Sequence, residues 1–141
     1  MSTRAIIAYA TEDGGWKGVW NHWGGHTQHL GRALIRGVAK RRGDLAAFIA
    51  ETIDGCPEGW SELGKTRCED PVGFLEGTFD GVVATCSSPQ CFDASYLYLV
   101  FVPKRRLYVF EVKDGPMRPF GMVTFDEAGA AKPRTLPSVE E

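Results

Sequence analysis

The hydrophobic and polar positions at the start of the chain predict a β-hairpin. Residues 3–10 alternate in polarity and contain Ile and Tyr, which is typical of a half-buried strand. A Glu-Asp-Gly-Gly turn at 12–15 leads into a second strand-like segment, 16–23, so the two segments form a hairpin. Gly24 and Gly25 then end the second strand.

Helical periodicity replaces this alternation in the next segment. Apolar residues recur at helical spacing and predict two amphipathic helices. The first begins at an N-cap Thr27 and ends at Gly43, and the second begins at a capping Asp44 and ends at Gly55. The short link between them predicts that they pack as a pair. Their apolar stripes consist of Leu30, Leu34 and Val38, and of Leu45, Phe48, Ile49 and Ile53.

The second half of the chain returns to strand patterns. Residues 55–93 are rich in Gly, Pro and acidic residues, which predicts loops with one short element around 82–85. The unbroken β-prone run 96–102 predicts a strand buried on both faces. After a turn, residues 107–112 form the returning strand, and residues 121–125 form a third.

This order of elements predicts an α+β fold. An antiparallel sheet of hairpins, one N-terminal and one C-terminal, carries the helix pair on one face. We expect a single domain over residues 1–126, because 141 residues suit one core. Residues 127–141 are rich in Ala, Pro and Glu and predict a disordered tail.

Composition places the chain among ordinary globular proteins. Hydrophobic residues make up 43% and charged residues 24% of the sequence, which excludes wholesale disorder. The longest apolar run is far too short to cross a bilayer, and the first residues lack the basic-then-apolar pattern of a secretory signal. We therefore expect a cytoplasmic protein that has no membrane partner.

Charge is distributed unevenly along the chain. The net charge of −2 excludes a polycation made for nucleic acid. Residues 1–42 hold seven Lys and Arg against two acidic residues, whereas residues 43–102 hold ten acidic residues against two basic ones. This asymmetry predicts one basic and one acidic surface. The acidic surface could bind a basic partner, as in a protein inhibitor, or could be a solvated face.

Four cysteines leave two interpretations open. In a chain without a secretory signal we expect free thiols at Cys56, Cys68, Cys86 and Cys91. A zinc site is the alternative, although the spacing of Cys86 and Cys91 is loose for zinc and the other two cysteines stand alone.

Candidate chemistry concentrates at residues 20–29, where the second strand meets the first helix. All three histidines and two of the four tryptophans lie there. A strand-to-helix junction is a natural anion site, because free backbone N–H groups and the helix dipole face the ligand. Trp23 would stack on a ring, and Gly25 would let the backbone approach. The predicted ligand site consists of His22, Trp23, Gly25, His26, Arg32 and Arg36. The alternative is a Trp-anchored hairpin with a structural His22.

Other chemistry stays open as alternatives. The three residues His22, His26 and His29 could bind a metal ion or serve a small hydrolase, but no nearby carboxylate completes an obvious set. Removal of the initiator Met would expose Ser2 as an N-terminal nucleophile, a property of any chain that begins Met-Ser. The sequence contains no phosphate-binding loop, no nucleophile elbow and no H-E-x-x-H motif, so we expect no cofactor.

A basic stripe follows the predicted site along the first helix. It could contact phosphate groups, but no aromatic residues interleave with it, which favours a solvated helix face over a nucleic-acid surface. The stripe consists of Arg32, Arg36 and Lys40, extended by Arg41 and Arg42.

Short motifs resemble a family of small proteins from phages and actinobacterial genomes. Members begin M-S-T-R and carry H-W-D-G-Y-P before a G-x-x-L helix, and to this family no activity is assigned. Residues 1–4 read M-S-T-R, residues 22–25 read H-W-G-G and residues 30–34 read L-G-R-A-L. The resemblance covers about the first 35 residues and, loosely, the hairpin at 94–112.

The chain departs from the family motif at three positions. Gly24 replaces the Asp, His26 the Tyr and Thr27 the Pro, so any role of that Asp is absent here. The resemblance implies a phage-type accessory protein made in the bacterial cytoplasm, and such proteins often neutralise host factors. We therefore expect a non-catalytic protein that binds a host protein or an anionic, nucleotide-like ligand, with a possible counter-defence role. The alternative is a small hydrolase built on the histidines, with or without a metal.

Overall fold

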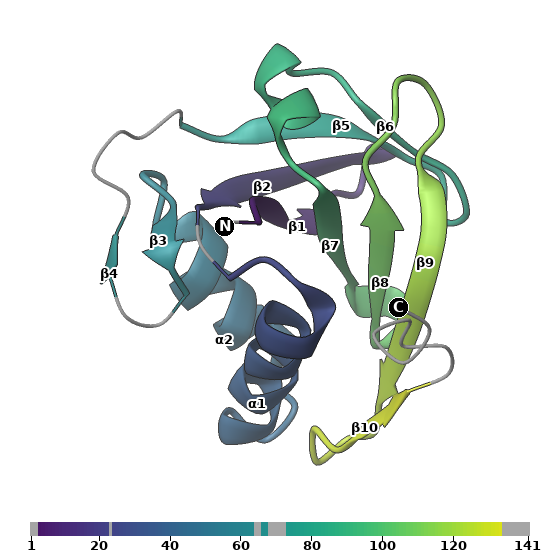
Figure 1. The fold of residues 1–141 in the computed structure, drawn as a ribbon. Helices are drawn as coiled ribbons and strands as arrows, with labels where there is room; N and C mark the ends of the chain where they lie inside the picture. Colours follow the sequence, from purple (N-terminus) through teal and green to yellow (C-terminus); the bar gives the residue numbers. More distant parts are fainter. Residues whose placement is uncertain (1–2, 23, 64–65, 68–72, 134–141) are drawn as a thin grey trace.

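One sheet organises the chain. The computed structural model describes residues 3–22, 24–63, 66–67 and 73–133 (Figure 1). The described strands are β1 (Ala5–Ala10), β2 (Gly15–Asn21), β3 (Trp60–Glu62), β4 (Thr66–Arg67), β5 (Leu75–Phe79), β6 (Ala84–Cys86), β7 (Tyr96–Phe101), β8 (Arg106–Glu111), β9 (Arg118–Phe125) and β10 (Ala131–Pro133). The helical segments are η1 (Thr27–Gly31), α1 (Arg32–Lys40), α2 (Leu45–Ile49), η2 (Ala50–Asp54), η3 (Pro89–Asp93) and η4 (Val102–Lys104).

The predicted α+β class and the hairpins are confirmed. The strand order is β10-β9-β8-β7-β1-β2-β3-β4, and most neighbours pair antiparallel. β1 and β2 form the N-terminal hairpin, and β7 to β9 form the C-terminal one with its third strand. The two halves join where β1 pairs with β7, which is a parallel pairing that hairpins alone do not predict.

β2 divides its outer edge between two partners. Its first half, Gly15 to Gly18, pairs antiparallel with β5, whereas Asn21 at its end pairs in parallel with Trp60 of β3. The buried Asn21 side chain accepts a hydrogen bond from the Leu63 backbone N–H at 3.1 Å. The sheet therefore branches at β2. One branch contains β3 and β4, and the other contains β5 and β6.

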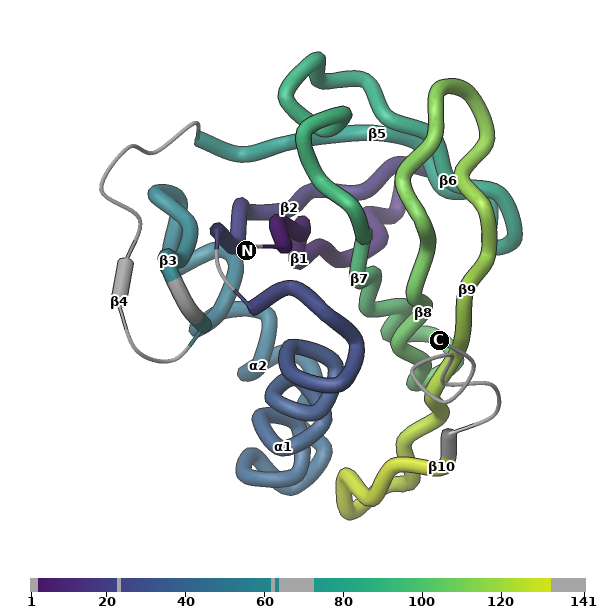
Figure 2. The backbone as a smooth tube through the Cα atoms, in the orientation of Figure 1, coloured from purple at the N-terminus to yellow at the C-terminus, as the bar shows by residue number. Residues whose placement is uncertain are grey.

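Hydrophobic cores cover both faces of the sheet. One contains alternate residues of the central strands together with the stripes of α1 and α2. The other lies beneath the β5–β6 hairpin, which is fastened by the Trp16 indole N–H to the Thr85 carbonyl (2.8 Å) and by the Met117 N–H to the Ala84 carbonyl (2.9 Å). β7 contributes to both cores, so a strand buried on both faces is confirmed over 96–101. Val102, the last residue of the predicted strand, belongs to η4 and is 42% exposed. Figures 1 and 2 show the helices and the β5–β6 hairpin on different sides of the central strands.

The helix boundaries follow the predicted signals with one correction. Asp44 caps α2, because its carboxylate accepts from the Ala47 N–H at 2.9 Å, and Gly55 ends η2. Thr27 is not the N-cap. It is the first helical residue and is buried, and the cap position belongs to His26, whose side chain makes no capping bond. Because Thr27 is buried inside the first helical turn, its hydroxyl does not have the capping role that the sequence predicts.

Three predictions about the rest of the chain differ from the structure. The sequence predicts loops with one short element over residues 55–93, but the described part of this segment contains β3, β4, β5, β6 and η3, because β2 and β5 supply pairing partners. Residues Ala131–Pro133 form β10 against β9, so the predicted disordered tail is structured at its start; residues 134–141 lie outside the described residues. Cys86 and Cys91 form a disulfide and are neither free thiols nor zinc ligands, because β6 and η3 bring their sulfur atoms together. Cys56 is a buried free thiol, as expected, and Cys68 lies outside the described residues.

A glycine pair tests the packing beneath the β5–β6 hairpin. At Gly77 an added Cβ would collide with the Trp16 indole and the Thr85 carbonyl oxygen, so Gly77→Ala should lower the free energy of unfolding by about 2 to 3 kcal/mol. At Gly31, which has helical backbone angles, the nearest atom is Tyr98 Cε1 at 3.8 Å. Gly31→Ala should therefore raise the free energy of unfolding by about 0.5 to 1 kcal/mol. Urea unfolding measures both, and equal effects would contradict this packing.

The disulfide predicts a difference in thiol labelling. Alkylation of the denatured chain without a reductant should leave two labels fewer than alkylation after reduction, because Cys86 and Cys91 are bonded. Mass spectrometry counts the labels, and Cys56→Ser should lose one label under both conditions. Reduction should also lower the free energy of unfolding by about 2 kcal/mol, the value expected for a short closed loop. Equal label counts with and without reductant would refute the bond.

Candidate functional site

The predicted anion-binding junction is used for internal packing. His22 is half-buried, and its backbone N–H donates to the Trp60 carbonyl at 2.9 Å. Gly25 is buried, donates its N–H to the Thr3 carbonyl at 2.9 Å and accepts at its own carbonyl from the Tyr98 hydroxyl at 2.7 Å. Trp23 lies outside the described residues.

The paired glycines bring the chain close to itself. A Cβ added at Gly25 would lie 2.7 Å from the Thr3 carbonyl oxygen and 3.0 Å from Ala5 Cβ, at the start of β1. At Gly24, where φ is +69°, the His29 ring covers the position of a side chain at 2.5 Å. The close backbone approach expected for a ligand is thus an approach to β1 and to His29.

The histidines serve local contacts. His26 is exposed, and its Nε2 lies 2.6 Å from the Thr3 hydroxyl oxygen, which ties η1 to the segment before β1. Within the described residues, no group of three or more His, Cys, Asp and Glu side chains is placed to hold a metal ion. The described part of the chain likewise contains no helix long and apolar enough to cross a membrane.

The arginines of the predicted site separate from its histidines. Arg32 and Arg36 are exposed on α1, one turn apart. Arg36 lines a groove of about 780 Å³, and Arg32 is not among the residues that line it. Of the predicted set, Arg36 lines this groove, together with residues from segments that the sequence analysis did not connect.

We call this hollow the cationic groove. It runs between α1, the α2–η2 helix and β3, and both basic and apolar side chains line it. The basic residues are Arg36, Lys40 and Arg41, and the others are Ala33, Gly37, Ala39, Phe48, Glu51, Thr52, Trp60 and Leu63. Among the described residues, no ion pair engages Arg36 or Lys40, and both side chains are exposed.

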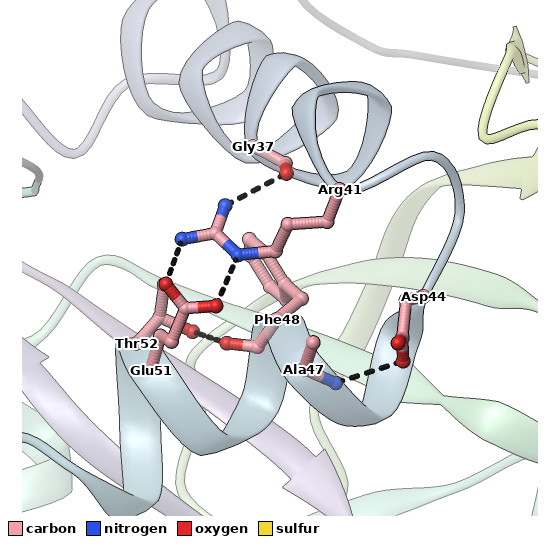
Figure 3. Close-up of polar contacts among 7 residues, drawn as sticks. All are labelled: Gly37, Arg41, Asp44, Ala47, Phe48, Glu51 and Thr52. Atoms are coloured by element: carbon pink, nitrogen blue, oxygen red, sulfur yellow. Dashed lines mark hydrogen bonds and ion pairs between the residues drawn. The ribbon is translucent and has the colours of Figure 1, made fainter.

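Arg41 has a structural role at the end of this groove. Its Nε and Nη2 each donate to a Glu51 carboxylate oxygen at 3.1 Å, and its Nη1 donates to the Gly37 carbonyl at 2.8 Å (Figure 3). The guanidinium carbon also lies 5.6 Å from the centroid of the Phe48 ring. This bidentate ion pair joins α1 to η2 and leaves Arg36 and Lys40 as the cations available to a ligand.

The apolar wall of the groove is held in a fixed orientation. The Trp60 indole N–H donates to the Thr52 carbonyl at 2.9 Å, and the Thr52 hydroxyl donates to the Phe48 carbonyl at 2.5 Å. Trp60 remains half-buried and its ring lines the groove. Trp60 lies in the segment 55–93, for which the sequence predicts loops, and no local pattern links it to α1. The pairing of β3 with β2 is what carries it there.

The lining of the groove combines charges that suit an anion with surface that suits a flat or apolar group. Two exposed cations one helical turn apart suit a phosphate or carboxylate, and an indole beside them suits a ring. No protein-family model, curated protein or solved structure matches the chain. The candidate site therefore depends on this geometry alone.

The Arg41–Glu51 pair predicts an acid-dependent loss of stability. Hydrogen bonds from Arg41 hold the pKa of Glu51 below its ordinary value of 4.5. Since the folded pKa is the lower one, the stabilisation is complete above about pH 5 and is lost as the pH falls through the folded pKa. Urea unfolding from pH 3 to 6 should show that Glu51→Gln is less stable than the unaltered protein above pH 5, with the difference shrinking toward pH 3.

An Arg41→Ala background supplies the control. There Glu51→Gln should change stability by nearly the same small amount at every pH in this range, because the bidentate partner is gone. A pH-dependent difference that survives in this background would assign the effect to another neighbour of Glu51.

Proposed function

We propose that this protein is a non-catalytic binding protein and that its cationic groove takes an anionic, nucleotide-like ligand. The observation that carries the proposal is the placing of Arg36 and Lys40, two exposed cations, beside the half-buried Trp60 ring in one groove. Phosphate groups would pair with the two cations, and the base would lie against the indole.

The form of the site supports binding without turnover. Glu51 is the acidic residue in the groove lining, and both of its oxygens accept hydrogen bonds from Arg41. No histidine is among the described residues that line the groove. The described groove lining thus offers no evident general base beside its cations, whereas charge and shape for holding a ligand are present.

The proposed ligand connects the two partners that the sequence predicts, a nucleotide-like ligand and a host protein. A protein that holds a nucleotide-like molecule without consuming it withholds that molecule from the host factor which depends on it. Counter-defence by a phage-type accessory protein is the setting that the family resemblance implies. The described site supports the ligand class, and the identity of a host factor is a separate question for experiment.

Titration with ATP tests this function. ATP should bind saturably in calorimetry, and Arg36→Ala with Lys40→Ala should weaken the affinity about tenfold or more, because two charge-assisted contacts are lost. Tripolyphosphate, which has no base, should bind more weakly than ATP. ³¹P NMR of the same mixture should show no hydrolysis.

A matched pair of substitutions controls for overall charge. Arg32→Ala with Lys132→Ala also removes two exposed cations, neither of which lines the groove, and should leave the ATP affinity nearly unchanged. Equal weakening by both double variants would mean that ATP responds to net charge only. An absence of saturable binding would refute the proposed ligand, and release of phosphate would favour the hydrolase alternative.

A further inference from the structure

A second groove, of about 810 Å³, lies on the other side of the α2–η2 helix. We call it the acidic groove. On that helix Ala46 lies about 160° around the axis from Phe48, which lines the cationic groove. The end of β1, the β1–β2 turn and the end of β7 complete the wall. The lining consists of Tyr9, Ala10, Thr11, Glu12, Asp13, Ala46, Ile49, Asp54, Phe101, Val102 and Pro103.

The charge in this groove is of one sign. Among the described residues, three carboxylates line it, those of Glu12, Asp13 and Asp54, and no Lys or Arg does. The tertiary structure brings together Glu12 and Asp13, the two acidic residues of the basic N-terminal segment, with Asp54 of the acidic middle segment. Asp13 accepts a hydrogen bond from the Thr11 hydroxyl at 2.5 Å, which lowers the pKa of Asp13 and keeps the carboxylate ionised.

One of the three carboxylates already binds a basic side chain. Lys17 Nζ lies 3.2 Å from an Asp54 carboxylate oxygen and 4.0 Å from the centroid of the Phe74 ring. The Tyr9 hydroxyl donates to the same carboxylate at 3.0 Å. Asp54 is therefore satisfied within the chain, and the negative charge left to an outside partner is that of Glu12 and Asp13.

The rest of the lining is apolar and partly open to solvent. Val102 is 42% exposed, and Pro103 beside it is exposed as well. A small cation would contact the carboxylates and leave this surface wet. An arginine side chain fits both halves, because its planar head pairs with carboxylates and its aliphatic stem covers apolar surface.

We propose that the acidic groove docks an arginine side chain of a partner protein. The guanidinium pairs with Glu12 and Asp13, and the stem with a flanking apolar residue covers Val102 and Pro103. Charge complementarity favours this occupant, since the groove holds two carboxylates without a basic partner among its lining residues. The inference is independent of the cationic groove and of its proposed ligand.

A pair of peptides tests this docking site. The probe is acetyl-Ala-Leu-Arg-Leu-Ala-amide, and its control carries citrulline, a neutral residue of the same shape, in place of arginine. In ¹⁵N-HSQC titrations of the full chain, the arginine peptide should shift the amides of Ala46, Ile49 and Val102 saturably. The citrulline peptide should bind at least fivefold more weakly, because it has no charge to pair.

Substitutions then locate the site on the protein. Glu12→Gln with Asp13→Asn should weaken the arginine peptide at least fivefold, and Val102→Ser should weaken both peptides. Asp114→Asn with Glu127→Gln removes two exposed carboxylates that do not line the groove and should change neither titration. The spectrum of each variant without peptide shows whether it is folded.

Three results would overturn the proposal. Equal affinities for the two peptides would show that arginine is not recognised, and equal weakening by the two acidic double variants would show attraction to net charge only. If instead the groove amides shift with protein concentration in the absence of peptide, the occupant is a second copy of the chain. A failure of ATP to bind, by contrast, would contradict only the function proposed for the cationic groove.

Discussion

β1 and β7 come from opposite halves of the chain and pair in parallel from Ala5 with Tyr96 to Tyr9 with Val100. Both strands are buried on both faces, and alternate residues of each supply the helix-side core and the core beneath the β5–β6 hairpin. Every other element packs on these two strands directly or through a neighbour. A non-local pairing of this kind forms only after a long loop has been closed, so the rest of the fold depends on apolar burial at this central seam.

The α2–η2 helix packs on that sheet and contributes to two grooves whose lining charges differ in sign. Its apolar stripe faces the core through Leu45, Phe48 and Ile53, and its two flanks line the cationic and the acidic grooves. The Arg41–Glu51 ion pair and the Lys17–Asp54 ion pair stand at the two flanks. Each pair neutralises one charge of its groove and leaves neighbouring charges of a single sign. A groove with basic side chains and a groove with acidic side chains therefore lie beside the same helix.

The candidate site shows which parts of a surface can be read from a local pattern. Arg36 is predicted as a ligand-binding residue because it follows the strand-to-helix junction at helical spacing, and the structure exposes it on α1. His22, Gly25 and His26 were predicted on the same reasoning from their density, but their contacts are with Trp60, Thr3 and Tyr98 of the fold itself. A cluster of functional residue types in the sequence shows only that these residues are near one another along the chain. It does not show which of them the neighbouring segments of the fold contact.

The α+β class, the two hairpins and the helix pair could be predicted from the sequence, and so could a doubly buried strand, which was expected over 96–102 and is observed over 96–101. Each of these depends on periodicity and turn chemistry within a window of a few residues. Tertiary contacts, by contrast, set the parallel β1–β7 pairing, the branch of the sheet at β2, the Cys86–Cys91 bond and the placing of Trp60 and Arg36 in one groove. These depend on contacts between residues that are close in space because other segments are buried, and no local pattern carries that information.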